Sequence, residues 1–235
     1  MGLFNLLWDP TYVLVLIGVA LSLLTSALVK MTYARYRGVE SKSGMTAEQV
    51  AQQMLYGAGI YDVQIVPIAG DLTDNYNPTN KTLNLSQTVY GSRSVAAIGV
   101  AAHECGHAIQ HARSYVFLGL RSAMVPAVNI CSTISWPIVM AGFLLGRNYY
   151  LMLAGIIFFG MAVLFSIVTL PVEFNASHRA LKILKESQML DRKEVSRARR
   201  VLTAAALTYV AAAASMILQL LRLLLLSGLL GNRRD

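Results

Sequence analysis

Three of the chain's four histidines lie close together, in the stretch AAHECGHAIQH at residues 101–111. Two of them, His103 and His107, are four residues apart, so on a helix they are about 40° apart around the axis and face the same side. Two neutral imidazoles in that arrangement can bind one Zn²⁺. Glu104 then points to the adjacent face, where it can reach a water on the metal without binding the metal. This His-Glu-x-x-His spacing predicts a zinc-activated water with Glu104 as its general base.

A catalytic zinc site needs a third protein ligand and one open position. A third histidine six residues after His107 would fall at position 113, which is Arg113. His111 is roughly 80° around the helix from His103 and two turns further along, too far to reach the same ion. We therefore expect His111 to be a surface or interfacial residue, and the third ligand to come from another segment.

The distribution of acidic residues indicates where that ligand is. No Asp or Glu occurs between Glu104 and Glu173. Two apolar runs lie between them and would return the chain to the same side of a membrane, so Glu173 is the first carboxylate to come back to the site. We predict Glu173 as the third ligand, with His178 as the alternative. His178 and Arg179 are also candidates to stabilise an oxyanion, against the alternative that both are ordinary juxtamembrane basic residues.

The composition indicates the elements that hold these residues. Hydrophobic residues make up 55% of the chain and charged residues only 14%, with a mean hydropathy of +0.52, whereas soluble domains have about 25% charged residues. Four buried helices of a soluble protein would be shorter and would show a polar stripe. Here four stretches carry no charge, and each is about as long as the ~20 residues that span a bilayer: 10–29, 122–146, 148–172 and 201–221.

Charges beside these runs predict the topology. Basic residues follow the first run at Lys30, Arg35, Arg37 and Lys42. By the positive-inside rule, residues 31 onward lie in the cytoplasm and the N-terminus lies outside. No basic residue precedes the first run, and the run exceeds the ~7–15 residues of a signal-peptide core, so we expect a retained anchor. Arg233 and Arg234 follow the last run and leave the topology of the C-terminal end open.

The net charge of +8 could suggest a nucleic-acid partner. The Lys and Arg residues cluster beside the apolar runs, however, and lack interleaved aromatic residues. We therefore interpret the charge as juxtamembrane and expect no nucleic-acid partner.

The segment before the histidine motif predicts a small α+β region. Thr46 to Gln49 matches a capping box that begins a helix. Residues 61–68 and Lys81 to Ser86 are expected to be short strands, and the turn-rich residues 71–80 between them would make these strands a hairpin. An exposed edge of the 81–86 strand would suit strand addition by an extended peptide.

The sequence thus predicts a mainly α membrane protein with about four transmembrane helices and a small cytoplasmic α+β zincin-like module. Residues 173–200 are expected to form two cytoplasmic helices, with a turn near Met189 and a capping box at Asp191 to Glu194. The expected segments are transmembrane helices at 11–30, 121–146, 148–172 and 201–230, a cytoplasmic helix and β-hairpin at 31–93, the zinc-binding helix at 94–115, and the helices with the third ligand at 173–200.

Three motifs carry a resemblance to a known family: AAHECGHAIQH, PVEFNASHRAL and DLTDNYNPTNKTLNLS. Together they resemble the YugP-like neutral zinc metallopeptidases of bacterial membranes, over nearly the whole chain. The resemblance implies a multi-span membrane protease with zinc held by His103, His107 and Glu173, and with Glu104 as base.

More distantly, the chain is similar to the HtpX and CAAX prenyl protease group. In that group an aspartate four residues after the zinc-binding glutamate supports a zinc-binding histidine. The corresponding residue here is Ser177, so an outer carboxylate is not expected and prenyl-peptide specificity is not carried over. Asn75 and Asn77 lie where the related group has a substrate-side asparagine, which makes Asn77 a candidate substrate contact.

These observations predict a gluzincin-like endopeptidase in the inner (plasma) membrane, with one Zn²⁺ per chain and an active site that faces the cytoplasm. Its substrate would be a polypeptide of the membrane or its vicinity, and its other partners the lipid bilayer and a second copy or another membrane protein. The alternative function is a non-catalytic zinc-stabilised scaffold or adaptor, which would need a fourth protein ligand such as His111 or His178. A metal transporter is disfavoured, because the charge-free runs hold no acid or base.

Overall fold

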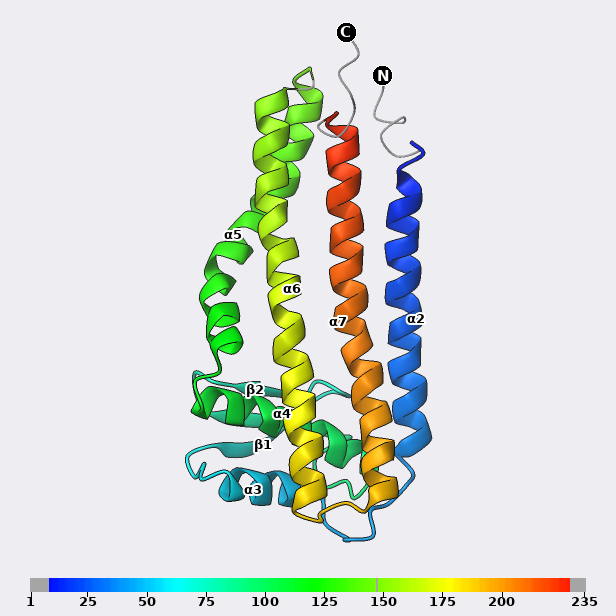
Figure 1. Cartoon of the computed structure of the whole chain (residues 1–235), viewed down its shortest axis with the longest axis vertical. Helices are drawn as coiled ribbons and strands as arrows, with labels where there is room; N and C mark the ends of the chain where they lie inside the picture. Colours follow the sequence, from blue (N-terminus) through cyan, green and yellow to red (C-terminus); the bar gives the residue numbers. More distant parts are fainter. Residues whose placement is uncertain (1–8, 147, 229–235) are drawn as a thin grey trace. The chain divides into compact units, whose positions relative to one another are not determined.

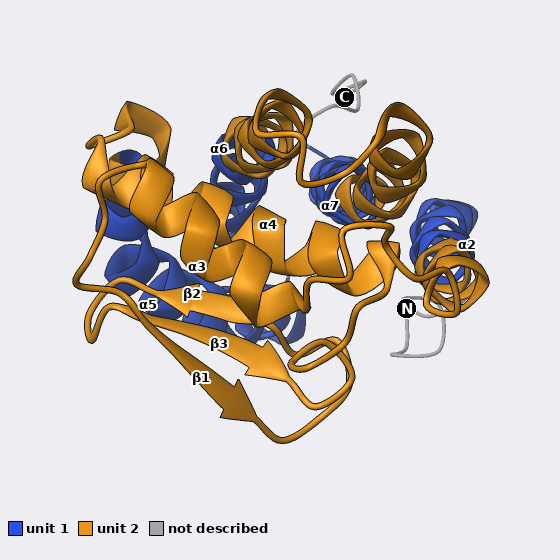
Figure 2. Cartoon of the chain, turned by 90° about the horizontal axis from the view of Figure 1, so that it is seen from below, with its two compact units in different colours: residues 1–25, 120–170, 208–235 blue, residues 26–119, 171–207 orange. Residues whose placement is uncertain are grey.

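The computed structural model describes residues 9–146 and 148–228. Its elements are shown in Figure 1 and are, in chain order, α2 (Tyr12–Tyr36), α3 (Ala47–Gly57), β1 (Gln64–Ile68), β2 (Asn75–Asn77), β3 (Thr82–Ser86), α4 (Val95–Ala112), α5 (Val116–Leu144), α6 (Tyr149–Glu186) and α7 (Arg192–Leu226). Two compact units are coloured separately in Figure 2: unit 1 is residues 1–25, 120–170 and 208–235, and unit 2 is residues 26–119 and 171–207.

Four helices, α2, α5, α6 and α7, are long and apolar enough to cross a membrane, judged by length and composition. They cover the charge-free runs expected from the sequence except for one or two residues at the ends of the first three runs, and the chain is mainly helical with one small sheet. The helix that begins at Tyr149 does not break at residue 172 but continues through Pro171 to Glu186. Arg147, Arg233, Arg234 and the last residues of the predicted fourth span lie outside the described residues.

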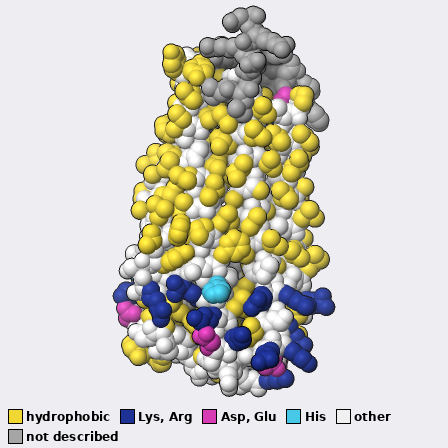
Figure 3. Space-filling view, in the orientation of Figure 1, with side chains coloured by type: hydrophobic (Ala, Val, Ile, Leu, Met, Phe, Trp, Pro, Cys, Tyr) yellow, Lys and Arg dark blue, Asp and Glu magenta, His cyan; other side chains and the backbone are white. Residues whose placement is uncertain are grey.

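Charged residues are rare in unit 1. Among its described residues they are Asp9, Arg121 and Arg222. On the face drawn in Figure 3, by contrast, Lys and Arg side chains gather over the segments of unit 2. This difference fits a unit 1 that is surrounded by lipid and a unit 2 that is exposed to water.

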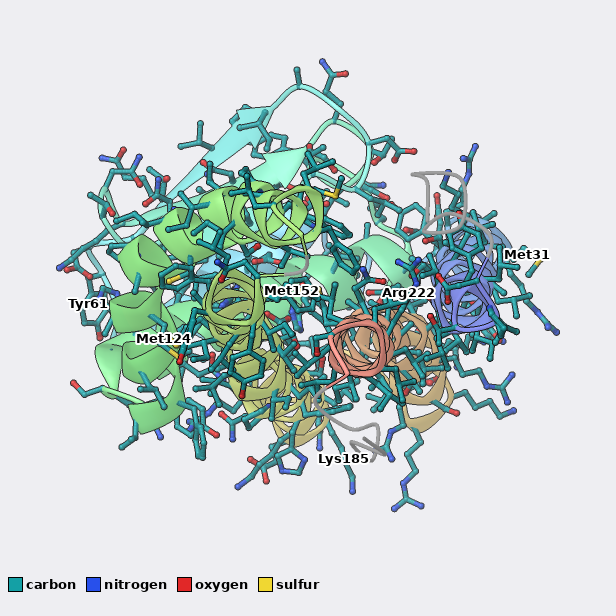
Figure 4. The ribbon with its side chains drawn as sticks, turned by 90° about the horizontal axis from the view of Figure 1, so that it is seen from above. Met31, Tyr61, Met124, Met152, Lys185 and Arg222 are labelled. Atoms are coloured by element: carbon teal, nitrogen blue, oxygen red, sulfur yellow. The ribbon has the colours of Figure 1, made fainter. Side chains whose placement is uncertain are left out.

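Arg222 is the charged residue within the predicted transmembrane helix 201–230, and it is buried on α7. Its Nη2 lies 3.1 Å from Asp9 Oδ2, and its Cζ lies 5.4 Å from the centre of the Tyr12 ring. Figure 4 shows Arg222 on the side of α7 that faces α2. The buried cation therefore has the partner that its removal from water requires.

Unit 2 contains a three-stranded sheet in the order β1-β3-β2. The first and last residues of β1, Gln64 and Ile68, lie opposite Thr82 and Ser86 of β3, so these two strands are parallel. β2 pairs with β3 in the antiparallel direction.

The hairpin predicted from the 61–68 and 81–86 strands is therefore wrong. The connection at residues 69–81 reaches the length of about a dozen residues that a parallel crossover needs. It also contributes β2, which takes the antiparallel position beside β3 and forms the hairpin instead. The exposed edge predicted at residues 81–86 is wrong for the same reason, because β3 is the central strand.

α3 and α4 cover one face of this sheet (Figure 2). At the start of α3, Gln49 Oε1 accepts the Thr46 N–H at 3.0 Å, as the predicted capping box requires. α4 begins at the N-cap Ser94, whose Oγ accepts the Ala97 N–H at 3.1 Å. Buried side chains of the three elements form one core, which includes Val50, Met54, Leu55, Leu83, Leu85, Ile98, Ala101, Ala102 and Cys105.

A reciprocal capping box begins α7. The Asp191 N–H donates to Glu194 Oε2 and the Glu194 N–H donates to Asp191 Oδ1, both at 2.8 Å. Lys42 binds the same pair, with its backbone N–H on Glu194 and its Nζ on Asp191, each at 2.8 Å. These bonds fix the turn between α6 and α7, and with it the end of the helix that carries Glu173.

Candidate metal centre

α4 places the two histidines of the motif against each other. Their rings meet edge to face with centroids 4.7 Å apart, and His103 Nε2 lies 3.2 Å from His107 Nε2. On another face of the helix, Cys105 is buried in the core with its thiol 3.6 Å from the Ala51 carbonyl oxygen. The apolar residues of the motif thus pack the helix, and the imidazoles are left to face α6.

Glu173 of α6 meets both imidazoles. Its Oε2 lies 3.3 Å from His103 Nε2 and 3.5 Å from His107 Nε2. With the 3.2 Å between the two nitrogens, the three donor atoms form a nearly equilateral triangle. Tetrahedral zinc with bonds of about 2.0–2.1 Å places its ligand atoms roughly 3.3–3.4 Å apart. The residues therefore fit three ligands of a tetrahedral zinc ion, and the fourth position is open among the His, Cys, Asp and Glu residues that the structure describes.

A glycine allows α6 to come this close to α4. A Cβ added to Gly106 would lie 2.5 Å from the Ala176 carbonyl oxygen and 3.0 Å from the Ala176 Cα. Gly106 precedes His107, and Ala176 lies on the helical turn that follows Glu173. The backbone contact therefore lies within one turn of ligands on both helices and sets the distance between them.

The electrostatics of the triangle favour a cation. Glu173 is 2% exposed, and a carboxylate that is so deeply buried needs a positive partner. Burial acts to lower the pKa of His107, but the hydrogen bond to Glu173, the negative charges of Glu104 and Glu173 and the hydrogen bond to Gln110 together raise that pKa. A proton or a metal ion would satisfy the same charge requirement.

Each histidine has a hydrogen-bond partner on its other ring nitrogen. His103 Nδ1 lies 3.0 Å from Ser177 Oγ, and His107 Nδ1 lies 3.0 Å from Gln110 Oε1. The ring partner of His103 is thus a hydroxyl and not a carboxylate. Such partners orient the ligand rings of metal sites.

Glu104 is buried, with 8% of its surface exposed, and it is not a member of the ligand triangle. A second carboxylate lies near it, on Asp74 of the turn-rich segment. Asp74 accepts the Ser86 N–H at 2.7 Å and the Ser86 hydroxyl at 2.9 Å. Burial raises the pKa of Asp74 against these hydrogen bonds, and the negative charge of Glu104 raises it further.

The other candidate residues lie outside the triangle. His178 is exposed on α6 and His111 is exposed on α4, where His111 Nδ1 lies 2.8 Å from the Tyr76 hydroxyl. Neither belongs to the ligand group found among the described residues. Asn77 is on β2, and its Oδ1 accepts the Thr79 N–H at 2.9 Å.

Arg179 is half-buried and belongs to a polar network that leads to His107. Its Nε–H donates to Asn175 Oδ1 at 2.6 Å, and its Cζ lies 5.8 Å from the centre of the Tyr115 ring. Asn175 Oδ1 also accepts from Gln110 Nε2 at 3.0 Å.

Sequence reasoning missed Gln110, Asn175 and Asp74, although Gln110 lies three residues after His107 and could have been sought as a ring partner at that spacing.

The fold and this site define a class: a mainly helical protein with membrane-length helices, in which an HExxH helix and a glutamate of a later helix bring together three side chains that could hold one metal ion. The chain belongs to the family described as "Putative neutral zinc metallopeptidase", which it matches over residues 11–228.

A curated relative supports this assignment. The chain is 44% identical over 198 residues to a Bacillus subtilis (strain 168) protein named "Putative membrane protease YugP", a match that covers 84% of this chain and 88% of the relative. No solved structure matches the chain.

Proposed function

We propose that this protein is an integral membrane zinc endopeptidase that hydrolyses peptide bonds of membrane or membrane-proximal polypeptides. The observation that carries this proposal is the triangle of His103, His107 and Glu173 donor atoms with edges of 3.2 to 3.5 Å. A structural zinc site is closed by four protein ligands, whereas a catalytic site keeps one position open. The three-residue ligand group among the described residues therefore favours the enzyme over a zinc-stabilised scaffold.

The residues of the chain divide the chemistry between them. Zinc held by His103, His107 and Glu173 would supply the Lewis acidity that polarises a carbonyl and acidifies water. Glu104 accepts the proton of the attacking water and then delivers it to the amine of the leaving peptide. Arg179 would donate to the carbonyl oxygen as charge develops there, since its Nε–H holds Asn175 and its two Nη groups form no hydrogen bond to the described part of the chain.

An extended polypeptide is the substrate form that the sheet favours. β2 is an edge strand of the sheet and packs against the helix that carries the histidines. A substrate segment that adds to the edge of β2 would run beside α4. Asn77 lies on this strand and would contact the substrate there.

The charge distribution supports a location in the inner (plasma) membrane with the site facing the cytoplasm. The parts of α2, α6 and α7 that belong to unit 2, and the residue that follows α2, carry many basic residues, among them Arg35, Arg37, Lys182, Arg199 and Arg200. Cytoplasmic ends of membrane helices carry such an excess of Lys and Arg. The site residues belong to the same unit.

The proposal is tested with the full chain purified in detergent and incubated with an unfolded polypeptide. We expect cleavage at internal peptide bonds, its loss after treatment with a chelator, and its recovery when zinc is restored. Mass spectrometry of the fragments reads out the cleavage sites. Cleavage that persists at full rate in the metal-free protein would refute a zinc mechanism.

Replacing Glu173 by alanine should remove the third ligand. We expect zinc affinity to fall by more than the roughly 10–100-fold that loss of an outer partner costs, measured by metal analysis and chelator competition. Glu186→Ala is the matched control, because this exposed glutamate lies on the same helix outside the ligand group. Equal zinc affinity in Glu173→Ala and in this control would exclude Glu173 as a ligand.

A further inference from the structure

Gln110 is a buried polar side chain of α4 that the proposed mechanism leaves unused. Its residue is 0% exposed, and a buried amide needs a partner for each of its hydrogen-bonding groups. Gln110 Oε1 faces His107 Nδ1 at 3.0 Å. Gln110 Nε2 donates to the Val172 carbonyl oxygen at 2.8 Å and to Asn175 Oδ1 at 3.0 Å.

These contacts fix the orientation of the amide. The Val172 carbonyl is only an acceptor. Asn175 Oδ1 also accepts the Nε–H of Arg179, and an arginine side chain can only donate. The end of Gln110 that faces these two oxygens must therefore be the NH₂ group, and the end that faces His107 must be the carbonyl oxygen.

A fixed carbonyl oxygen fixes the proton of His107. An oxygen that can only accept requires a proton on His107 Nδ1, and neutral imidazole then has its lone pair on Nε2. That Nε2 is the atom that belongs to the ligand triangle. The partner of His103 imposes no such choice, because the Ser177 hydroxyl can donate or accept.

The geometry of the triangle explains why the position of the proton on His107 has to be fixed. The two Nε2 atoms are 3.2 Å apart, so two protons pointing between them would repel each other. Glu173 Oε2, at 3.5 Å from His107 Nε2, would otherwise attract a proton to that nitrogen and block it as a ligand. Gln110 opposes this attraction from the other side of the ring.

We propose that Gln110 is a positioning residue that holds His107 in the Nδ1–H tautomer and so keeps Nε2 ready to bind zinc. The inference rests on the proposed zinc site and adds the residue that determines which nitrogen of His107 is free to bind the metal. It also assigns a positioning role to Asn175 and Arg179, because their contacts prevent the Gln110 amide from flipping by 180°.

The test reads the tautomer directly in the metal-free full chain, labelled with ¹⁵N-histidine, in detergent at alkaline pH. The chain has four histidines, so long-range ¹H–¹⁵N spectra contain four imidazole systems, which single His→Gln variants assign. We expect the His107 proton on Nδ1 in the wild type and on Nε2 in Gln110→Met, together with roughly 10–100-fold weaker zinc binding in that variant.

Two further variants keep the result interpretable. Gln110→Glu retains an acceptor for His107 and should keep the proton on Nδ1, even if Gln110→Met folds poorly by circular dichroism. Ser177→Ala removes the partner of the other ligand and should leave the His107 tautomer unchanged.

Two results would overturn the inference: a wild-type His107 proton on Nε2, or unchanged tautomer and zinc affinity in Gln110→Met. A wild-type chain that binds no zinc would instead refute the proposed function. The tautomer of the metal-free protein would still decide the role of Gln110.

Discussion

Replacing Glu104 by glutamine is expected to lower the rate of peptide-bond cleavage by about 10²–10⁴-fold, the range that a general base contributes. We expect the upper part of that range, because Glu104 would serve in two proton transfers, from the water and to the leaving amine. Glutamine has nearly the same shape but cannot accept a proton at this position. Turnover of a defined peptide by the detergent-solubilised protein measures the effect.

The same variant should keep its zinc. Glu104 is buried beside the histidines but does not belong to the ligand triangle, so zinc content should remain near that of the wild type. The two measurements together separate a base from a ligand. Cleavage at the wild-type rate by Glu104→Gln would contradict its role as base, and loss of zinc would indicate that Glu104 binds the metal.

Replacing Gly106 by alanine is expected to disrupt the metal site although no ligand changes. The added Cβ would lie 2.5 Å from the Ala176 carbonyl oxygen, whereas heavy atoms in contact prefer about 3.5 Å or more. The atom in the way belongs to the backbone of α6 and not to a flexible side chain, so α6 would have to move away from α4 by roughly 1 Å. Metal sites tolerate deviations of only about 0.2 Å in ligand distance. Zinc binding should therefore weaken by at least about 10-fold, as measured by chelator competition.

A second glycine serves as a control that separates the effect of the close helix contact from the general effect of replacing glycine by alanine in a helix. Gly119 lies in α5, and a Cβ there would meet no atom within 4 Å. Gly119→Ala should leave zinc affinity unchanged and stabilise the protein by up to about 1 kcal/mol, because alanine favours helix over glycine. Equal zinc affinity in Gly106→Ala and Gly119→Ala would show that the contact at Ala176 does not set the distance between the helices.

Together, the candidate residues divide into those that bind, those that transfer protons and those that set distances. In the proposed mechanism His103, His107 and Glu173 supply the donor atoms, and Glu104 is the base. Gly106 sets the separation of the two helices, while Gln110 and Ser177 hold the rings from behind. Gly106, Gln110 and Ser177 have no unusual chemistry. A search of the sequence for reactive side chains therefore passes over Gly106 and Gln110.

The sequence alone determined the features that depend on spacing along one element. Helical periodicity puts His103 and His107 on one face, and runs without charge identify the four membrane-length helices. The capping box at Asp191 to Glu194 is local in the same sense, since residues three apart satisfy each other's backbone groups. The place of Glu173 beside the histidines could also be predicted, because no acid occurs between Glu104 and Glu173 and two apolar runs return the chain to the same side.

Tertiary structure alone decided what depends on contacts between distant segments. Strand pairing is one such feature: β1 and β3 are parallel because β2, which looked like a turn, occupies the antiparallel place. The partners of the histidines are another, since Ser177 lies 74 residues from His103 along the chain and Asn175 is 65 residues from Gln110. Periodicity reports which side of a helix faces inward, but it carries no information about which atoms of a second helix meet it there. That choice is made by packing, at a glycine that lets two backbones touch.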